Sequence, residues 1–178
     1  KNKKIILSAG RLTHQKNYLY LIDEFFEFSK INDEFVLLIL GDGEKKNELL
    51  KLIKKRRIEE KVFLLGHKKN IYSFIRNSSV FVLSSLWEEV GFVIVEAAFC
   101  NTLVISSNCP NGPKEFLDNG KRGILFNSNK KKALLNSLNH FSKMEKNQIF
   151  EYKKKLKKEA KKYTIFNHYT VLNKILKF

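Results

Sequence analysis

Residues 84–98 read Ser-Ser-Leu-Trp-Glu-Glu-Val-Gly-Phe-Val-Ile-Val-Glu-Ala-Ala, and this stretch decides the fold. It follows a short apolar run at 80–83 that is typical of a buried strand. Its own apolar run, from Val90 to Ala98, is long enough to form a helix that lies against a sheet. Glu88 falls in the connecting loop, and Glu96 falls about two turns into the helix. Because an acid among apolar residues is costly to bury without a partner, we expect Glu96 to meet a ligand hydroxyl.

Strand-like and helix-like segments alternate along the rest of the chain, which predicts a parallel sheet with helices on both faces. In such Rossmann-like α/β folds, ligands bind beyond the carboxyl ends of the strands. We expect about six strands, at 5–9, 35–40, 62–65, 80–83, 103–105 and 123–126. The expected helices lie near 17–30, 44–57, 70–77, 91–100, 113–118 and 130–142, with more helix to the end of the chain.

The loop after the first expected strand reads Gly-Arg-Leu-Thr-His-Gln-Lys-Asn over residues 10–17. Gly10 lets the backbone approach a ligand closely, Arg11 offers forked donors, and Lys16 supplies a point charge. The following helix start adds aligned N–H groups, so the loop predicts a cradle for a diphosphate. The alternative is a basic turn in which Asn17 caps a helix.

Composition narrows the function only partly. The chain has 178 residues, 43% of them hydrophobic, which suits a single domain with one core. Its 34 Lys and Arg residues against 18 acids give a net charge of +16. This charge favours nucleic acid, anionic membranes or phosphorylated ligands as partners, unless much of it is only solvated surface.

Other motifs exclude some classes of protein. Cys100 and Cys109 lack the spacing of zinc ligands or of a disulfide framework, which points to a reducing cytosol. Neither a signal peptide nor an apolar run of membrane-spanning length is present, so any membrane contact is expected to be peripheral. Gly41 and Gly43 form only part of a dinucleotide fingerprint, which argues against a nicotinamide-dependent dehydrogenase.

Two motifs, residues 10–17 and then residues 88–96 along the chain, resemble those of retaining glycosyltransferases of family 4. The spacing from Glu88 to Glu96, with Gly91 three residues after the first, is similar to E-G-F-G-x-x-x-x-E-A, although Glu89 and Val90 depart from that pattern. The loop 10–17 is similar to the family's G-R-x-x-x-x-K-N. A third motif, residues 109–115, resembles the Cys-Pro-x-Gly-Pro-[KR]-Glu loop of bacterial cell-surface sugar transferases, several of which use UDP-N-acetylhexosamines.

The resemblance implies one half of a two-domain GT-B fold. The chain would be the C-terminal, nucleotide-sugar-binding domain over residues 1–178, and the N-terminal acceptor domain would lie outside it. The family transfers sugars with retention, here from a UDP-sugar to a cell-surface glycan or lipid-linked acceptor. It needs no metal or other cofactor. The implied location is the cytoplasm or the inner face of the cell membrane, where the basic helices would contact anionic lipid.

The resemblance also implies roles for individual residues. Arg11 and Lys16 would stabilise the leaving diphosphate, and Glu88 would bind hydroxyls of the donor sugar. Glu96 would bind the ribose, and the loop with His67 would hold the base. Gly10 would allow close approach, and backbone N–H groups would face phosphate at Val90, Gly91 and Phe92.

Two alternatives remain open on the sequence alone. Glu88 and Glu89 are solvated loop acids if the resemblance fails, with Glu96 paired to a neighbour. In that case a basic nucleic-acid-binding α/β module, using the charges at residues 54–57, is the other class of function.

Overall fold

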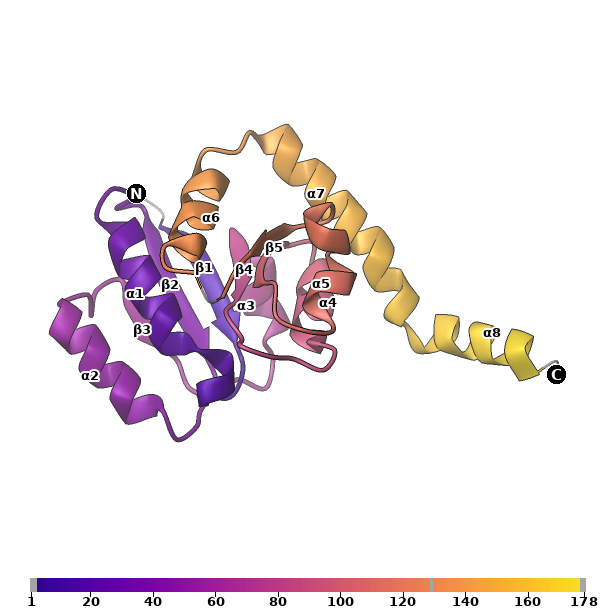
Figure 1. Ribbon diagram of the computed structural model, residues 1–178, viewed down its shortest axis with the longest axis horizontal. Helices are drawn as coiled ribbons and strands as arrows, with labels where there is room; N and C mark the ends of the chain where they lie inside the picture. Colours follow the sequence, from indigo (N-terminus) through magenta and orange to yellow (C-terminus); the bar gives the residue numbers. More distant parts are fainter. Residues whose placement is uncertain (1–2, 129, 177–178) are drawn as a thin grey trace.

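A parallel sheet in the order β3-β2-β1-β4-β5-β6 forms the centre of the molecule (Figure 1). The computed structural model describes residues 3–128 and 130–176. The strands are β1 Lys4–Ala9, β2 Phe35–Leu40, β3 Val62–Leu64, β4 Val80–Leu83, β5 Leu103–Ser107 and β6 Ile124–Phe126. Near-continuous apolar runs such as those of β2 and β4 are typical of parallel strands covered on both faces.

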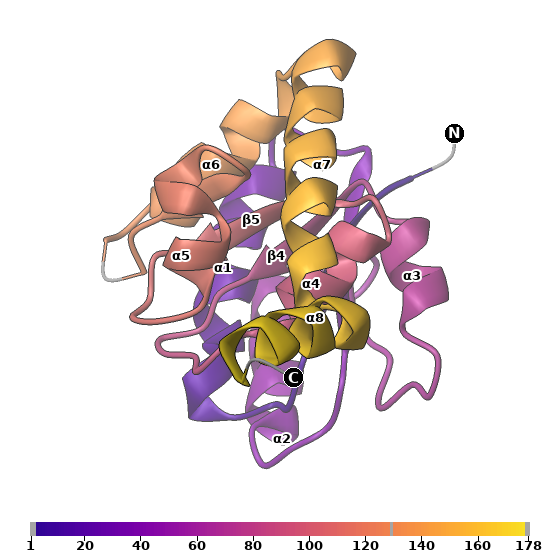
Figure 2. The same ribbon diagram turned by 90° about the vertical axis from the view of Figure 1, so that its right-hand side faces the viewer.

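Helices cover the sheet on both sides (Figures 1 and 2). On one side α1 packs against α2 and α6, and on the other α4 packs against α3 and α7. The main helices are α1 Tyr18–Ser29, α2 Lys46–Arg56, α3 Tyr72–Arg76, α4 Phe92–Phe99, α5 Pro113–Phe116, α6 Ala133–Ser142, α7 Lys146–Ala160 and α8 Ile165–Leu176. The predicted Rossmann-like α/β fold is therefore confirmed.

On one side of the sheet the core runs from α1 over β2 to α6. Phe25, Phe28, Phe35 and Phe141 form a chain of aromatic contacts with ring centroids 5.2 to 6.2 Å apart. In α1 the buried residues Leu21, Ile22, Phe25 and Phe28 recur at helical spacing and face the sheet.

The predicted end of the fifth strand was wrong by two residues. Ser106 and Ser107 belong to β5, where Ser106 lies opposite Leu83 of β4 and Ser107 opposite Phe126 of β6. Serine is common in loops, so its polarity suggested that the strand had ended. Both side chains are nevertheless fully buried.

The C-terminal helices divide into a packed part and a bare part. Leu156 and Ala160 of α7 are buried against the body of the protein. Helix α8 points away from that body (Figure 1), and none of its described residues is buried. Apolar side chains of this end therefore pack against the body in α7, at Leu156 and Ala160, and are exposed in α8.

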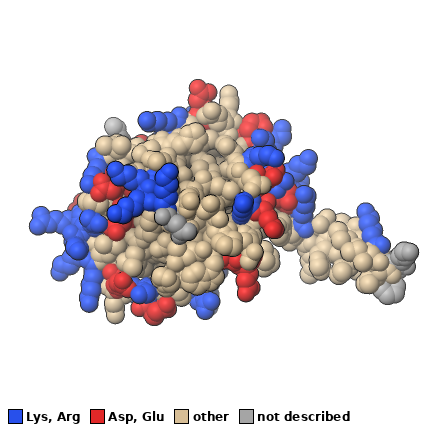
Figure 3. All heavy atoms as spheres, in the orientation of Figure 1, with Lys and Arg blue, Asp and Glu red and all other residues tan. Residues whose placement is uncertain are grey.

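Basic side chains gather at several places on the surface, including the exposed side of α2 and α7 (Figure 3).

The sheet order reverses between β1 and β4, which lie side by side while their following helices cover opposite faces. This reversal is the switch point at which α/β sheets form a ligand crevice.

Candidate functional site

The loop that follows β1 carries two of the predicted cations. The chain leaves β1 at Gly10, makes a short 3-10 helix at His14–Lys16 and enters α1 through Asn17, whose φ is 54°. Asn17 occupies the cap position of α1, but its side chain makes no capping bond. Arg11 is exposed, and within residues 3–128 and 130–176 no hydrogen bond or ion pair holds its guanidinium.

The loop that follows β4 carries the predicted carboxylate. Glu88 is only 7% exposed, whereas its neighbour Glu89 is exposed. Gly91 then caps α4 with φ 69° and ψ 48°, a left-handed conformation that glycine adopts without strain. Glu88 is therefore not a solvated loop acid, and burial separates it from Glu89 as the motif spacing did.

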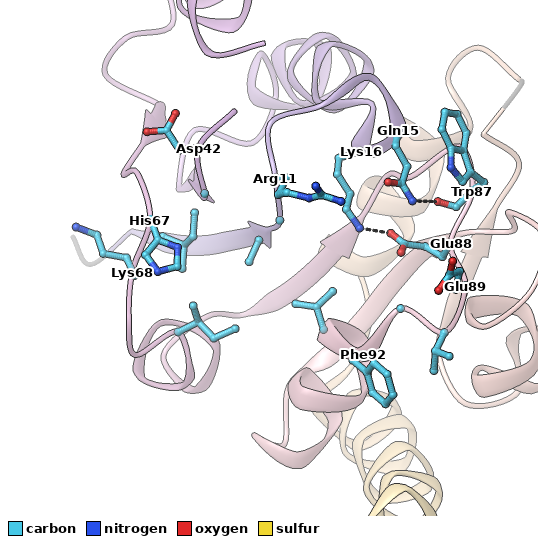
Figure 4. A pocket seen from close by; sticks show the side chains of 18 residues that line it. Arg11, Gln15, Lys16, Asp42, His67, Lys68, Trp87, Glu88, Glu89 and Phe92 are labelled. Atoms are coloured by element: carbon cyan, nitrogen blue, oxygen red, sulfur yellow. Dashed lines mark hydrogen bonds and ion pairs between the residues drawn. The ribbon is translucent and has the colours of Figure 1, made fainter. Parts of the chain in front are cut away.

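Glu88 is held by two short polar contacts (Figure 4). Lys16 Nζ donates to Glu88 Oε1 at 2.5 Å, and Ser85 Oγ donates to the same oxygen at 2.5 Å. The Lys16 side chain is 15% exposed, so the ion pair lies largely out of water. Interactions with an ionised partner in such surroundings are among the stronger hydrogen bonds of proteins.

Three further hydrogen bonds join the same two loops. Leu86 N donates to Gln15 O at 2.8 Å, and Gln15 Nε2 donates to Trp87 O at 2.9 Å. Ser84 Oγ donates to Lys16 O at 2.7 Å. The segment around Lys16 and the segment around Glu88 are thus fixed to each other at several points.

The glycines after β2 bring a third loop against the first. A Cβ atom on Gly41 would lie 1.9 Å from Gly10 O, and one on Gly43 would lie 2.7 Å from Leu12 O. The two loops exchange backbone hydrogen bonds, with Leu12 N donating to Asp42 O at 2.9 Å. Gly41 and Gly43 have a structural role, as the incomplete fingerprint indicated. Because they lack a side chain, this loop can lie directly against the loop that carries Arg11.

A fourth loop supports the segment before α4. A Cβ on Gly112 would lie 2.3 Å from Val90 O, so the loop after β5 packs directly on the backbone beside Gly91. Pro113 occupies the start of α5, as predicted. Cys109 is buried in the same loop, and burial raises the pKa of its thiol.

The loops that follow β1, β2, β3 and β4 surround a cavity of about 910 Å³ (Figure 4). His67 and Lys68 lie on the side opposite Glu88, and Arg11 and Lys16 lie between. Eight of the predicted site residues line the cavity: Gly10, Arg11, Lys16, His67, Glu88, Val90, Gly91 and Phe92. Their roles toward a ligand stay predictions, but the structure brings them together.

Glu96 is the predicted site residue that does not line this cavity. It lies further along α4, where Tyr72 Oη donates to Glu96 Oε1 at 3.4 Å. Partial burial raises the pKa of Glu96, and the bond from Tyr72 acts in the opposite direction. The partner expected for this acid is present in the protein itself, as the alternative interpretation held.

Three residues of these motifs were given no role in the prediction, and two of them, Gln15 and Trp87, line the cavity. Ser85, Gln15 and Trp87 all connect the two loops or hold Glu88. A hydroxyl three residues before Glu88, inside the same short loop, was the available signal for Ser85. The contacts of Gln15 and Trp87 cross 72 residues of sequence, and no local pattern predicts them.

The described part of the chain offers no cluster of three or more His, Cys, Asp or Glu side chains suited to a metal ion. The expectation of metal-free chemistry stays a prediction. Within the same residues, no helix has both the length and the apolar character required to cross a membrane.

The arrangement as a whole suits a ligand that is anionic at one end and rich in hydroxyls at the other. Two cations and the start of α4 can receive a diphosphate, since backbone N–H groups at helix starts favour anions. A buried carboxylate beside them can accept hydrogen bonds from sugar hydroxyls.

Solved structures share this fold. The chain superimposes on Anabaena HepE in complex with UDP with a TM-score of 0.87, at 19% identity, covering 99% of this chain and 50% of that one. It superimposes on TarM with a TM-score of 0.84, at 22% identity, covering 99% and 35%. At these identities the likeness shows the fold.

Curated relatives found by sequence have higher identity to the chain than these two solved structures. The chain is 32% identical over 161 residues to the N-acetylgalactosamine-N,N'-diacetylbacillosaminyl-diphospho-undecaprenol 4-alpha-N-acetylgalactosaminyltransferase of Campylobacter jejuni, covering 90% of this chain and 43% of the relative. It is 35% identical over 143 residues to the amylovoran biosynthesis glycosyltransferase AmsD of Erwinia amylovora, covering 80% and 40%. The chain thus spans less than half the length of these curated relatives.

The family described as Glycosyl transferases group 1 matches residues 1–163, a range that contains every loop of the cavity. Because this match runs through nearly the whole chain, the protein belongs to the group 1 glycosyl transferases.

Proposed function

We propose that this chain is the donor-binding domain of a retaining hexosyl- or N-acetylhexosaminyltransferase that uses a UDP-sugar, with UDP-N-acetylhexosamines as the narrower donor class. The observation that carries the proposal is the cavity in which Arg11, Lys16 and Glu88 converge at the start of α4. The names of the related proteins support it, since several refer to N-acetylhexosaminyl or galactosyl transfer.

In this proposal the two cations receive the diphosphate. Arg11 is free to turn toward an anion, and Lys16 would exchange its contact with Glu88 for a phosphate oxygen. Stabilising the departing diphosphate lowers the barrier to transfer, and one such contact is worth roughly 3–4 kcal/mol. No metal is required for this role, because the cations neutralise the leaving group.

The remaining residues would orient the donor. Glu88 binds hydroxyls of the sugar, the N–H groups from Val90 to Phe92 face phosphate, and the loop with His67 holds the base. Glu96 binds the ribose, which requires the nucleotide to reach past Phe92 toward Tyr72.

A second domain would bind the acceptor. The chain spans 43% of the Campylobacter relative, which leaves room in such proteins for an N-terminal acceptor domain. Lipid-linked acceptors are the class we propose, since two relatives are named for undecaprenol-linked substrates. Basic side chains such as those of α2 or α7 would then rest on the inner face of the cell membrane, with about 1 kcal/mol from each basic residue near anionic lipid.

Isothermal titration calorimetry tests the donor proposal. We expect UDP and UDP-sugars to bind this chain, GDP- and ADP-sugars to bind more weakly, and Arg11→Ala to weaken UDP binding. Absence of binding at millimolar UDP would refute it. Salt-sensitive binding of nucleic acid that a UDP-sugar does not displace would favour the basic nucleic-acid-binding module instead.

A transfer assay tests the two-domain proposal. The chain alone is expected to show at most slow donor hydrolysis, because holding acceptor and donor together contributes up to roughly 7–11 kcal/mol. Comparable transfer to an acceptor by this chain and by the full-length protein would refute it. Flotation with anionic and neutral vesicles tests the membrane contact, and equal recovery with both would refute that part.

A further inference from the structure

We propose that Ser85 is a positioning residue for Glu88 and that Ser107 in turn holds Ser85. Together they fix the carboxylate so that Oε2 faces the donor sugar. The inference rests on the proposed function, in which Glu88 receives sugar hydroxyls.

The two serines form a short chain of hydrogen bonds that ends on the carboxylate. Ser107 Oγ donates to Ser85 O at 2.6 Å, and Ser85 Oγ donates to Glu88 Oε1 at 2.5 Å. Both serine side chains are fully buried. Ser107 belongs to β5, so these hydrogen bonds connect Glu88 to the sheet and not just to a neighbouring loop.

Lys16 cannot perform this task in the proposed reaction. Its contact with Oε1 has the same length, but its long side chain is partly exposed and is expected to turn to the diphosphate. When Lys16 leaves, Ser85 is the side-chain hydrogen-bond partner that Glu88 keeps among the described residues. A fixed carboxylate is worth more to binding than a mobile one, because less conformational entropy is lost when the ligand arrives.

The geometry also assigns the two oxygens of Glu88. A carboxylate oxygen accepts about two hydrogen bonds, and Oε1 already accepts one from Lys16 and one from Ser85. Within residues 3–128 and 130–176, no described contact occupies Oε2. Oε2 is therefore the oxygen that a hydroxyl of the donor sugar can meet without first displacing Lys16.

Calorimetry with UDP and with UDP-N-acetylglucosamine or UDP-glucose separates this role from general packing. We expect Ser85→Ala to weaken binding of the UDP-sugar about tenfold, as for loss of a hydrogen bond to a charged group, and to weaken UDP binding much less. The matched control is Ser106→Ala, a buried serine of β5 whose hydroxyl donates to the neighbouring Ser107 O and does not contact Glu88. Equal losses for UDP and UDP-sugar in Ser85→Ala, or equal losses in both serine variants, would overturn the proposal.

A double-mutant cycle adds a second readout. In the Glu88→Gln background Ser85→Ala should cost little further UDP-sugar affinity, since the charged acceptor is gone. If Ser85→Ala fails to fold, Ser107→Ala takes its place, with a smaller loss of the same kind. Full additivity of either serine variant with Glu88→Gln would show that the serine does not act through Glu88.

A measurement without ligand keeps this inference apart from the proposed function. If the parent chain binds no uridine nucleotide, the proposed function fails. Urea unfolding of the parent, Ser85→Ala, Glu88→Gln and the double variant then decides whether Ser85 holds Glu88. Non-additive changes in the free energy of unfolding support the bond, and additive changes overturn it.

Discussion

Lys16 Nζ and Glu88 Oε1 lie 2.5 Å apart, so the cation expected to meet phosphate and the anion expected to meet sugar are bound to each other. A donor that draws Lys16 to its diphosphate must break this pair, whereas a sugar hydroxyl can reach Oε2 of Glu88 beside it. The two side chains therefore cannot be regarded as independent contributions to binding.

Removing the charge of Glu88 should strengthen the binding of UDP. In Glu88→Gln, Lys16 loses its ionic partner and is free for the diphosphate, so we expect UDP affinity to rise by roughly 1 kcal/mol, about fivefold. The same variant should lose the extra affinity that the sugar gives to a UDP-sugar. Calorimetry with both ligands measures the two effects, and weaker UDP binding would show that the ion pair does not compete with phosphate.

Removing Lys16 should destabilise the chain. Lys16→Met leaves a buried carboxylate with Ser85 as its remaining partner, which we expect to cost about 1–3 kcal/mol in the free energy of unfolding. Urea denaturation provides the measurement, with Lys54→Met on exposed α2 surface as the control. Adding Glu88→Gln to Lys16→Met should recover part of the loss. An unchanged parent-like stability of Lys16→Met would mean that solvent screens the pair.

Gly41→Ala should disturb the first loop through backbone contact alone. Its Cβ would collide with Gly10 O and its φ of +136° disfavours a side chain, so we expect a loss of roughly 2–4 kcal/mol and weaker UDP binding. Gly66→Ala is a matched control, because its φ is +69° but its Cβ would meet nothing within 4 Å. That control should cost only about 1–2 kcal/mol. Equal losses in the two variants would contradict the role of close approach.

Glu96 should make stability depend on pH. Burial raises the pKa of Glu96 above its ordinary value of 4.5, so the folded state prefers the protonated acid. Its favourable contribution is present below the ordinary pKa and is lost as the pH rises through the raised value. Glu96→Gln should therefore unfold like the parent at acid pH and be more stable at neutral pH, while binding UDP less well. Tyr72→Phe should change stability in the opposite direction, since the bond from Tyr72 lowers the pKa. Urea denaturation across this range tests both, and a stability difference between Glu96→Gln and the parent that does not vary with pH would refute the assignment.

The sequence predicted the positions of the strands along the chain and the convergence of the site because both follow from local patterns. Apolar runs marked the strands, and parallel topology then placed the loops after β1 and β4 together. What it could not predict depends on packing between distant residues. The pairing of Lys16 with Glu88, the distance of Glu96 from the cavity and the burial of Ser106 and Ser107 are of this kind. The bare face of α8 is similar, since its apolar pattern is the same whether or not a partner covers it.

The three hydrogen bonds that fasten the loops after β1 and β4 all use a main-chain carbonyl as acceptor, at Gln15, Lys16 and Trp87. Substitution of Lys16 or Trp87 removes a side chain but leaves its carbonyl, and the spacing of the loops can survive the change. Evolution can therefore exchange the charged and aromatic groups of this site while the loops keep their distance. A frame of this kind would let the side chains that contact a ligand change while the pocket keeps its shape.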